Sequence, residues 1–565
     1  MPLIVNKPVE RLSGPYARRW WALLVLCLSL MISVMANTAL TVAAPAMTRD
    51  LDLSSSDLQW VIDAYTVPYA ALMLLLGAIG DKYGRRGSLV LGLLIMAAGG
   101  VAGTFADTSA QVIVVRAVMG FGAAMIMPAT LSLLAATFPR EERAKAITIW
   151  AATSGLSIAA GPLIAGVLLK DNGWESTFLI NVPVCVVAVL AAYVLVPPSK
   201  AGDRGRIDYG GGVLSVIWSG ALIYMIIDGP HFGWGKSAFT AAGIAALGLL
   251  LFVWWELRHP RPILDVRKFA ERAFAGANLA IAVFFLAVFG VFYYLTQHFQ
   301  FVLDYDPLET GIRMLPLAFG VFLGAALTGA LTPRLGARIM VTVGMVGGTT
   351  ALALLIGVDG SSTYSDFVAP LALLGLSLGL AVSPCTDTIM GAFPESELGV
   401  GGAVNDTSLE LGGSLGIAVL GSALASSYAS NLTDETKGSK VPPEALEAAK
   451  DSVGAGNAVA QSFQEKAQQL TEQAAQAGSP AEAAQLKQQA AEITKGSAQM
   501  ADAVGSAFSD AVSQTSLIGA ITLGAGALIV AVLMPRKSAR PQPPTPEEHH
   551  RAEPQQEPVP TRAGR

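Results

Sequence analysis

Two acidic residues four positions apart, Asp406 and Glu410, lie in an otherwise apolar stretch from Gly401 to Gly421. The stretch is long and apolar enough to form a membrane-spanning helix. A charged side chain near the bilayer centre costs about 2.5–3.5 kcal/mol, so such residues usually face a bundle interior or a water-filled cavity. On a helix the two acids share one face, where burial and mutual repulsion disfavour ionising both. We therefore expect one of them to hold a proton more readily than a free carboxylate does, as proton exchange for another ligand requires.

The composition is that of a polytopic membrane protein. Of the 565 residues, 53% are hydrophobic and only 14% are charged, whereas soluble domains are about 25% charged. The three cysteines, Cys27, Cys185 and Cys385, lie in apolar segments and lack metal-ligand spacing, so we expect neither disulfides nor a metal site. No nucleotide-binding or nucleophile motif occurs, which predicts no cofactor and no enzymatic activity. The net charge of −5 gives no indication of a nucleic-acid partner.

Fourteen segments are predicted to span a membrane, because each offers about 20 mostly apolar residues. They are 20–41, 58–79, 87–106, 111–136, 144–170, 177–197, 207–227, 238–257, 274–295, 309–332, 338–358, 367–391, 403–427 and 514–534. An even number places both termini on one side. Since Arg and Lys gather in the loops of that side, both termini are predicted to be cytoplasmic.

The chain contains two copies of a six-helix unit. Residues 77–86 align without gaps with 329–338, and 138–161 align with 393–416. Spans 1–6 and 9–14 are therefore two repeats, with spans 7 and 8 inserted between them. Repeats with a binding site at their interface are a transporter design.

The same alignment places the two acids in one repeat only. Asp406 falls where the first repeat has Ala151, and Glu410 falls where it has Gly155. One copy of the span thus supplies a glycine and the other supplies charge, as expected of a specialised site.

The expected domain organisation follows from these spans. It is a six-helix bundle at 1–200, two linker helices at 201–272, five helices of the second bundle at 273–429, an extracytoplasmic helical hairpin at 430–513, the last span at 514–535 and a disordered cytoplasmic tail at 536–565. The hairpin rests on two Ala-, Gln- and Glu-rich stretches, Asn457–Ala477 and Pro480–Ala511, with apolar residues at helical intervals. The alternative is a partly ordered, solvated loop.

The loop between the second and third spans carries a spaced set of glycines and charges. These residues are Gly77, Asp81, Gly84, Arg85 and Arg86. A carboxylate there can cap a helix N-terminus or pair with a basic residue, and so hold one conformation. The pattern resembles the signature loop of the major facilitator superfamily.

Arg116 stands inside the fourth span, where an unpaired charge is costly and an acidic or carbonyl partner is expected. The surrounding sequence resembles the span-4 motif of that superfamily, whose Arg is linked to proton coupling. Met119 stands where many members have Gln. The alternative is a purely structural role for Arg116.

The fifth span carries Gly155, Gly161 and Pro162, which permit a kink and close packing. In this position they resemble the antiporter motif, which occurs in exporters of the superfamily.

The first span resembles its family signature less well. Asn37 and the residues after it match, but Ala36 stands where the signature has an Asp. Asp63 of the second span, between Trp60 and Tyr65, is a candidate replacement. Three roles are open for Asp63: binding a cation, pairing with Arg116, or being a solvated acid near the membrane surface.

Together these motifs resemble the fourteen-span drug:proton antiporter branch of the superfamily, relatives of the quaternary-ammonium and tetracenomycin exporters. The resemblance implies an all-α polytopic membrane protein with two six-helix bundles and two extra helices, and the sequence itself adds the hairpin, which is longer than the insertion usual in this branch. The resemblance also implies a monomer of the bacterial inner membrane that exports amphipathic, cationic drugs and antibiotics in exchange for protons. Expected partners are the small-molecule substrate, protons, membrane lipids and an envelope component that binds the hairpin.

The expected site has two sets of residues. Proton coupling and substrate binding are assigned to Glu410, Asp406, Asp63 and Arg116, and the cavity wall to Asn37, Trp60, Tyr65, Phe289, Tyr293 and Asn405. The aromatic stripe of the ninth span, which contains Phe289 and Tyr293, either lines the cavity or packs against helices and lipid.

Two other functions stay open. One is transport of lipids or endogenous metabolites toward the cell envelope. The other is a non-transporting receptor or assembly protein, which has no need of the signature loop or of paired membrane acids.

Overall fold

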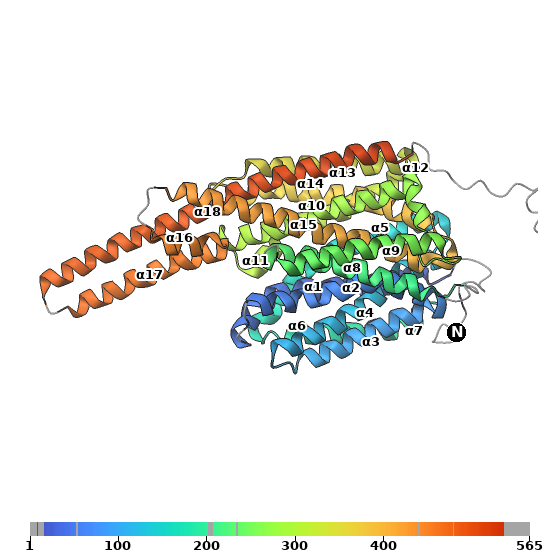
Figure 1. Cartoon of the computed structure of the whole chain (residues 1–565), viewed down its shortest axis with the longest axis horizontal. Coiled ribbons are helices and arrows are strands. Elements are labelled where there is room, and N and C mark those ends of the chain that lie inside the picture. Colours follow the sequence, from blue (N-terminus) through green and yellow to red (C-terminus); the bar gives the residue numbers. More distant parts are fainter. Residues whose placement is uncertain are drawn as a thin grey trace, which may run out of the picture.

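The apolar stretches of the sequence form long helices in the structure, a computed structural model (Figure 1). It describes residues 8, 16–51, 53, 55–201, 207–232, 235–437, 441–477 and 479–535, and these contain no strand. The predicted all-α fold is confirmed. The predicted tail at 536–565 lies outside the described residues.

The first repeat and the inserted pair contain nine α-helices among the described residues. They are α1 (Arg19–Asp50), α2 (Ser55–Tyr83), α3 (Arg85–Gly103), α4 (Ser109–Thr137), α5 (Arg140–Asp171), α6 (Ser176–Leu179), α7 (Asn181–Leu195), α8 (Tyr209–Phe232) and α9 (Lys236–Arg258). The second repeat and the hairpin follow, with α10 (Arg272–Phe301), α11 (Pro307–Arg313), α12 (Leu315–Leu335), α13 (Ala337–Leu354), α14 (Tyr364–Gly391), α15 (Leu398–Glu435), α16 (Pro443–Lys450), α17 (Val453–Gln476) and α18 (Pro480–Leu533). Short 3₁₀ turns include η2 (Val266–Ala270), η3 (Leu355–Gly357) and η4 (Glu395–Glu397).

Thirteen stretches of the described chain are long and apolar enough to cross a membrane. The helix α5 is not one of them, although it packs along α1 and α12 within the bundle. The count of fourteen spans therefore stays a prediction.

The two repeats pack in the same way. In the first, α1 lies against α5, α2 against α4, and α3 against α4; in the second, α10 lies against α15, α12 against α14, and α13 against α14. The halves then exchange contacts reciprocally, since α15 packs on α2 and α4 while α5 packs on α12 and α14. This arrangement brings α5 and α15, the pair aligned in the sequence, to the centre of the interface.

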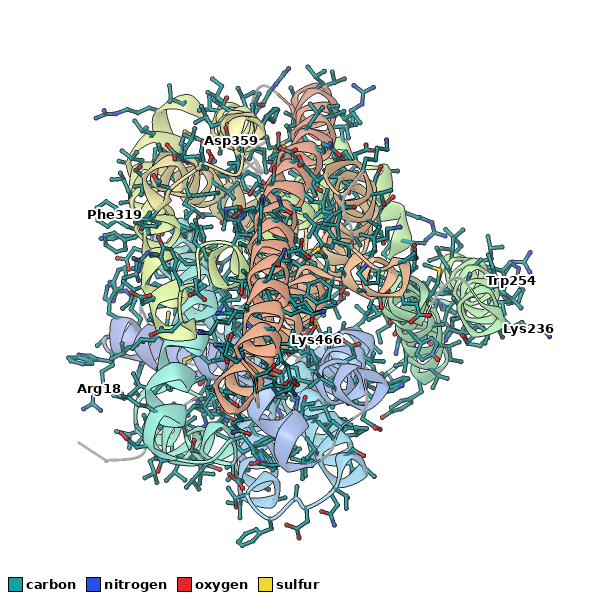
Figure 2. All side chains as sticks on the ribbon, turned by 90° about the vertical axis from the view of Figure 1, so that its left-hand side faces the viewer. Arg18, Lys236, Trp254, Phe319, Asp359 and Lys466 are labelled. Carbon is teal, nitrogen blue, oxygen red and sulfur yellow. The ribbon has the colours of Figure 1, made fainter. Side chains whose placement is uncertain are left out.

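The outer surface of the bundle is apolar, as contact with lipid requires. Large exposed hydrophobic side chains include Phe319 and Phe322 on α12, Leu250 on α9 and Val532 on α18. Figure 2 shows Phe319 and Trp254 at the periphery, on α12 and on the inserted α9.

The helices α17 and α18 lie side by side as an antiparallel hairpin that projects from one end of the bundle (Figure 1). Alanines fill their contact, including Ala467, Ala474 and Ala490. The sequence predicts separate segments at 480–511 and 514–534, but α18 is one helix of 54 residues. No proline follows Pro480 before Pro535, so nothing forces a break.

We call the end of the bundle with the projecting helices the hairpin end. The opposite end, which carries Arg19, Arg85, Arg86 and Arg258, is the basic end.

Candidate functional site

Asp406 is completely buried in the middle of the bundle, on α15. Its Oδ1 accepts a hydrogen bond of 3.0 Å from the Asn405 side-chain amide, whose own oxygen accepts one of 2.9 Å from the Thr386 hydroxyl. The other oxygen, Oδ2, is buried and has no hydrogen-bond partner. A buried carboxylate oxygen without a donor is costly when ionised, so this atom is suited to carrying a proton.

Glu410 lies one turn further along α15 and is half-buried. It interacts electrostatically with Asp406 and with Tyr69 of α2. The Tyr69 ring in turn packs on Tyr65, with ring centroids 5.7 Å apart. The acids of the second repeat are thereby connected to a helix of the first repeat.

Tyr69 is a site residue that the sequence reasoning missed. It stands four positions after Tyr65 on the same helix, and this spacing places both rings on one face. The spacing indicates that Tyr69 lies on the same helix face as the candidate Tyr65, but nothing in the sequence indicates that this face of α2 contacts α15.

Arg116 is buried and is satisfied mainly by backbone carbonyls. Its guanidinium donates to Ala36 O at 2.8 Å, and to Val61 O and Ile62 O at 3.2 Å each. These contacts supply the carbonyl partners that an intramembrane Arg requires. Arg116 therefore ties α4 to α1 and α2, and Ala36 takes part through its backbone.

Side chains complete the surroundings of Arg116. Asn37 accepts a hydrogen bond of 3.0 Å, and the guanidinium lies 4.6 Å from the centre of the Tyr65 ring. Asp63 is 8% exposed and acts electrostatically on Arg116. The structure thus brings Arg116, Asn37, Asp63 and Tyr65 together, and Tyr65 leads on through Tyr69 to Glu410.

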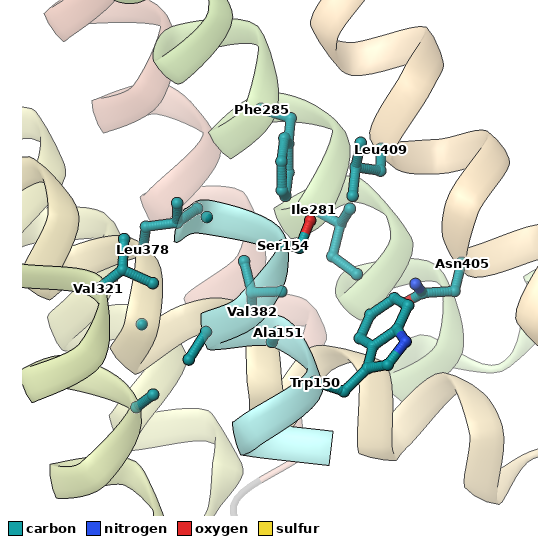
Figure 3. A pocket seen from close by; sticks show the side chains of 14 residues that line it. Trp150, Ala151, Ser154, Ile281, Phe285, Val321, Leu378, Val382, Asn405 and Leu409 are labelled. Atoms are coloured by element: carbon teal, nitrogen blue, oxygen red, sulfur yellow. The ribbon is translucent and has the colours of Figure 1, made fainter. Parts of the chain in front are cut away.

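A small pocket lies beside the acids, where α5 meets α10, α12, α14 and α15 (Figure 3). Trp150 and Phe285 give it two aromatic walls, and Ser154 and Asn405 give it polar groups. Ala151 and Gly155 line it from α5. Because Asn405 lines the pocket and also donates to Asp406, a molecule in the pocket would be one residue away from the buried acid.

The other predicted cavity residues lie elsewhere. Trp60 packs on Tyr224 of α8 at 5.6 Å between ring centroids. Phe289 and Tyr293 pack on α15 at Gly413 and Gly421. Among the six predicted cavity residues, Asn405 is the one that lines the pocket described above. Phe289 and Tyr293 instead pack against a helix, which is the second alternative given for the aromatic stripe.

The predicted motif of α5 faces two different helices. Gly155 packs against Val321 of α12, and Gly161 lies against Thr38 of α1. The side chain of Pro162 lies outside the described residues, while the backbone there is helical.

Asp81 closes the interface between the halves at the basic end. It is fully buried, and both its oxygens accept from Gly399 N, at 2.9 and 2.8 Å, while Oδ2 also accepts from Val400 N at 3.3 Å. These N–H groups form the N-terminus of α15, which favours a negative charge. The signature loop of the first repeat therefore caps the helix that carries the two acids.

The neighbours of Asp81 hold it in place. Arg85 donates to its Oδ1 at 2.7 Å and to Glu395 O at 2.5 Å, so it reaches both halves. Arg86 donates to Val196 O at 3.1 Å. Gly84 has a φ of 135°, a conformation that side chains disfavour. A methyl group on Gly77 would lie 2.6 Å from Gly399 O, so only glycine permits this approach.

Contacts also join the halves at the hairpin end. Leu163 of α5 packs on Gly311 of α11, and Leu308 packs on Gly166 of α5. The pocket near Asn405 thus lies between contacts at both ends.

Within the described part of the chain, no group of three or more His, Cys, Asp or Glu side chains could hold a metal ion.

Comparisons with known proteins agree with this architecture. The family model of the Major Facilitator Superfamily matches residues 26–417. The multidrug resistance protein Stp of Mycobacterium tuberculosis is 32% identical over 68% of this chain and 72% of its own. The methyl viologen resistance protein SmvA of Salmonella typhimurium is 33% identical over 78% of this chain and 89% of its own.

A solved structure shares the fold. A bacterial homologue of the human lysosomal transporter Spinster, in an inward-facing conformation, superposes with a TM-score of 0.53 over 92% of this chain and 98% of its own, at 19% identity.

Proposed function

The chain belongs to the Major Facilitator Superfamily, and we propose that it exports amphipathic, cationic compounds in exchange for protons, with Asp406 and Glu410 as the exchange site. The observation that carries the proposal is the buried Oδ2 of Asp406, which has no partner, beside a second acid on the same helix. Such a pair binds either a proton or a cation, and competition between the two ligands couples their movements.

The proposed substrate class rests on the pocket and on the relatives. Trp150 and Phe285 offer aromatic surfaces and Asn405 offers a hydrogen bond next to Asp406. Aromatic faces attract organic cations. Stp and SmvA carry the names of multidrug and methyl viologen resistance proteins, and methyl viologen is an organic dication. These names support drugs and antibiotics as substrates.

The proposed cycle is alternating access between the two halves. With the basic end toward the cytoplasm of a bacterial cell, as the positive-inside rule predicts, release of the Asp81 contact opens the site to the cytoplasm. Substrate then enters as the acids lose their protons. Separation at Leu163–Gly311 and Leu308–Gly166 opens the other side, where protons displace the substrate.

Efflux driven by an imposed proton gradient tests the proposal. In proteoliposomes, methyl viologen transport should depend on the pH difference, and Glu410→Gln and Asp406→Asn should each lower the proton-driven rate by about tenfold or more, which corresponds to about 1.4 kcal/mol. Both replacements keep the shape of the side chain and remove its charge.

Asp434→Asn is the matched control, because Asp434 is an exposed acid on the same helix, 64% exposed in its pair with Lys437. It should retain the wild-type rate. If the Glu410 and Asp406 variants both keep full proton-driven transport, the proposed exchange site is wrong. If lipid in place of the cation moves with the gradient, the substrate class is wrong.

A further inference from the structure

A second pair of buried carboxylates lies at the basic end, on the inserted helices. Asp208 directly precedes α8, and Glu256 is in the last turn of α9. They are 5% and 1% exposed, respectively. Neither belongs to the repeats or to the site around Asp406.

Asp208 is surrounded by hydrogen-bond donors. Gly211 N donates to its Oδ1 at 2.9 Å, and the Trp255 indole lies 3.0 Å from both oxygens. His259 Nδ1 is 3.4 Å from Oδ2, but its hydrogen bonds are with Arg261. The Gly211 amide and the Trp255 indole therefore hold Asp208 in place, where it caps the N-terminus of α8.

Glu256 has the opposite surroundings. Its Oε2 accepts one hydrogen bond, of 3.3 Å, from Leu264 N, and its Oε1 is buried without a partner. A methyl group on Gly211 would collide with Glu256 Oε1 and lie 2.8 Å from Asp208 Oδ2. Glu256 Oε1 and Asp208 Oδ2 therefore border the same small space, which stays open because Gly211 has no side chain.

Within the part of the chain that the structure describes, the charged groups around this space do not neutralise it. Asp265, after α9, adds a negative charge close to Glu256. Arg258 stacks on Trp254, Arg267 donates to Leu257 O, and His259 Nδ1 also lies 2.9 Å from Arg261 O. From α2, which packs on α8, Tyr83 contacts the Tyr209 hydroxyl and Lys82 lies over the Tyr83 ring. Among the described residues, none donates to Glu256 Oε1.

We propose that Asp208 and Glu256 form a second proton-binding site, in which Glu256 Oε1 carries one proton and donates it to Asp208 Oδ2. Two ionised carboxylates bordering one buried space repel each other, and a shared proton removes that repulsion. The proton satisfies Oε1 and adds one more donor to Asp208.

The pair joins three segments of the insertion. Asp208 holds the start of α8, Glu256 holds the end of α9, and Leu264 N links them to the chain before α10. Gly212, which follows the Gly211 that donates to Asp208, packs on Leu75 of α2. When the proton is lost, the two negative carboxylates repel each other, and the packing of α8 on α2 loosens. The stability of this packing therefore depends on the pH at the basic end.

Infrared difference spectroscopy of the purified full-length protein tests the site without any transport measurement. As the pH rises from about 5 to about 9, the wild type should lose a carbonyl band of protonated carboxylic acid. Glu256→Gln, which has the shape of the protonated acid, should lack the part of that band that comes from Glu256 and release one proton fewer per molecule. Asp208→Asn, which removes the repelling charge, should shift the loss of the band to lower pH.

Glu271→Gln is the matched control, because Glu271 is an exposed glutamate on the same side of the bundle, and it should behave as the wild type. The proposal is overturned if Glu256→Gln releases as many protons as the wild type. It is also overturned if Glu256→Gln shows the same band as the wild type and the wild type is stabilised instead by sodium, since the pair would then hold a metal cation. Protonated Asp406 and Glu410 absorb in the same region, so the Glu256 band is the difference between the wild type and Glu256→Gln, and either proposal can fail alone.

Discussion

The Asp81 carboxylate of the first repeat accepts hydrogen bonds from Gly399 N of the second repeat, although 318 residues separate them in the sequence. Gly399 lies in the first turn of α15, and Asp406 follows about 10 Å along the same helix, at 1.5 Å per residue. A movement that releases Gly399 therefore acts on the element that holds the buried acids. This connection gives the signature loop a direct mechanical route to the proposed exchange site.

Replacing Asp81 should destabilise the protein strongly. In Asp81→Asn the buried guanidinium of Arg85, 2% exposed, loses its charge partner, and breaking a buried pair costs about 3–5 kcal/mol. Thermal unfolding in detergent measures this change. Asp265→Asn removes an exposed acid whose pair with Arg267 spans 3.9 Å, and it should cost less than about 1 kcal/mol. Equal effects of the two variants would mean that the contacts of Asp81 with Arg85 and Gly399 add nothing to stability.

The ion pair between Arg19 and Glu142 should make stability depend on acid pH. The guanidinium donates to Glu142 at 2.6 and 2.9 Å, and this hydrogen bonding lowers the pKa of Glu142 below its usual value. Its contribution is therefore present above the pKa of the unfolded chain and disappears as the pH falls through the lower folded value.

The test compares Glu142→Gln with the wild type. The variant should melt earlier at neutral pH, and the difference should begin to shrink below about pH 4, near the usual pKa of Glu, and vanish once the pH is below the lower folded pKa. A gap that shrinks above the usual pKa of Glu, or that does not shrink in more acidic buffer, would contradict the sign of this linkage.

His298 should tolerate loss of its polarity. It is 1% exposed, neither ring nitrogen has a partner, and the rings of Phe367 and Phe508 lie 5.0 and 6.2 Å away. Since an unsatisfied buried polar group costs about 1–3 kcal/mol, His298→Leu should leave stability unchanged or raise it by up to that amount. The pH profile of transport should stay the same; a displaced profile would identify His298 as a titrating group in the cycle.

The contact between α17 and α18 should depend on the size of its alanines. Ala467 is 3% exposed, so Ala467→Leu overpacks the contact, at about 1–3 kcal/mol. Trypsin should then cleave at Lys466 and Lys487 faster, by about tenfold for each 1.4 kcal/mol. Ala475→Leu, at an exposed position of the same helix, is the control. Transport should be unchanged in both variants, and unequal transport would show that the hairpin takes part in the cycle.

Patterns within the sequence were enough to predict the membrane class, the superfamily and the repeat. Hydropathy marks stretches that lipid or a helix bundle can bury. The sequence predicts Gly77, Asp81 and Gly84 in one loop, but Gly77 and Asp81 lie in the last turns of α2 and only Gly84 separates α2 from α3. The helix period likewise predicts that Asp406 and Glu410 share a face. Each of these features depends on neighbours in the chain.

The tertiary structure decided which helix each face meets. Phe289 and Tyr293 pack on glycines of α15, Tyr69 meets Glu410, and Glu256 Oε1 points into the space beside Asp208. In a membrane protein the lipid and the bundle interior are both apolar, so hydropathy does not tell a helix face that packs on protein from one that meets lipid. Only the packing of distant segments determines that choice, together with the partners of the buried polar atoms.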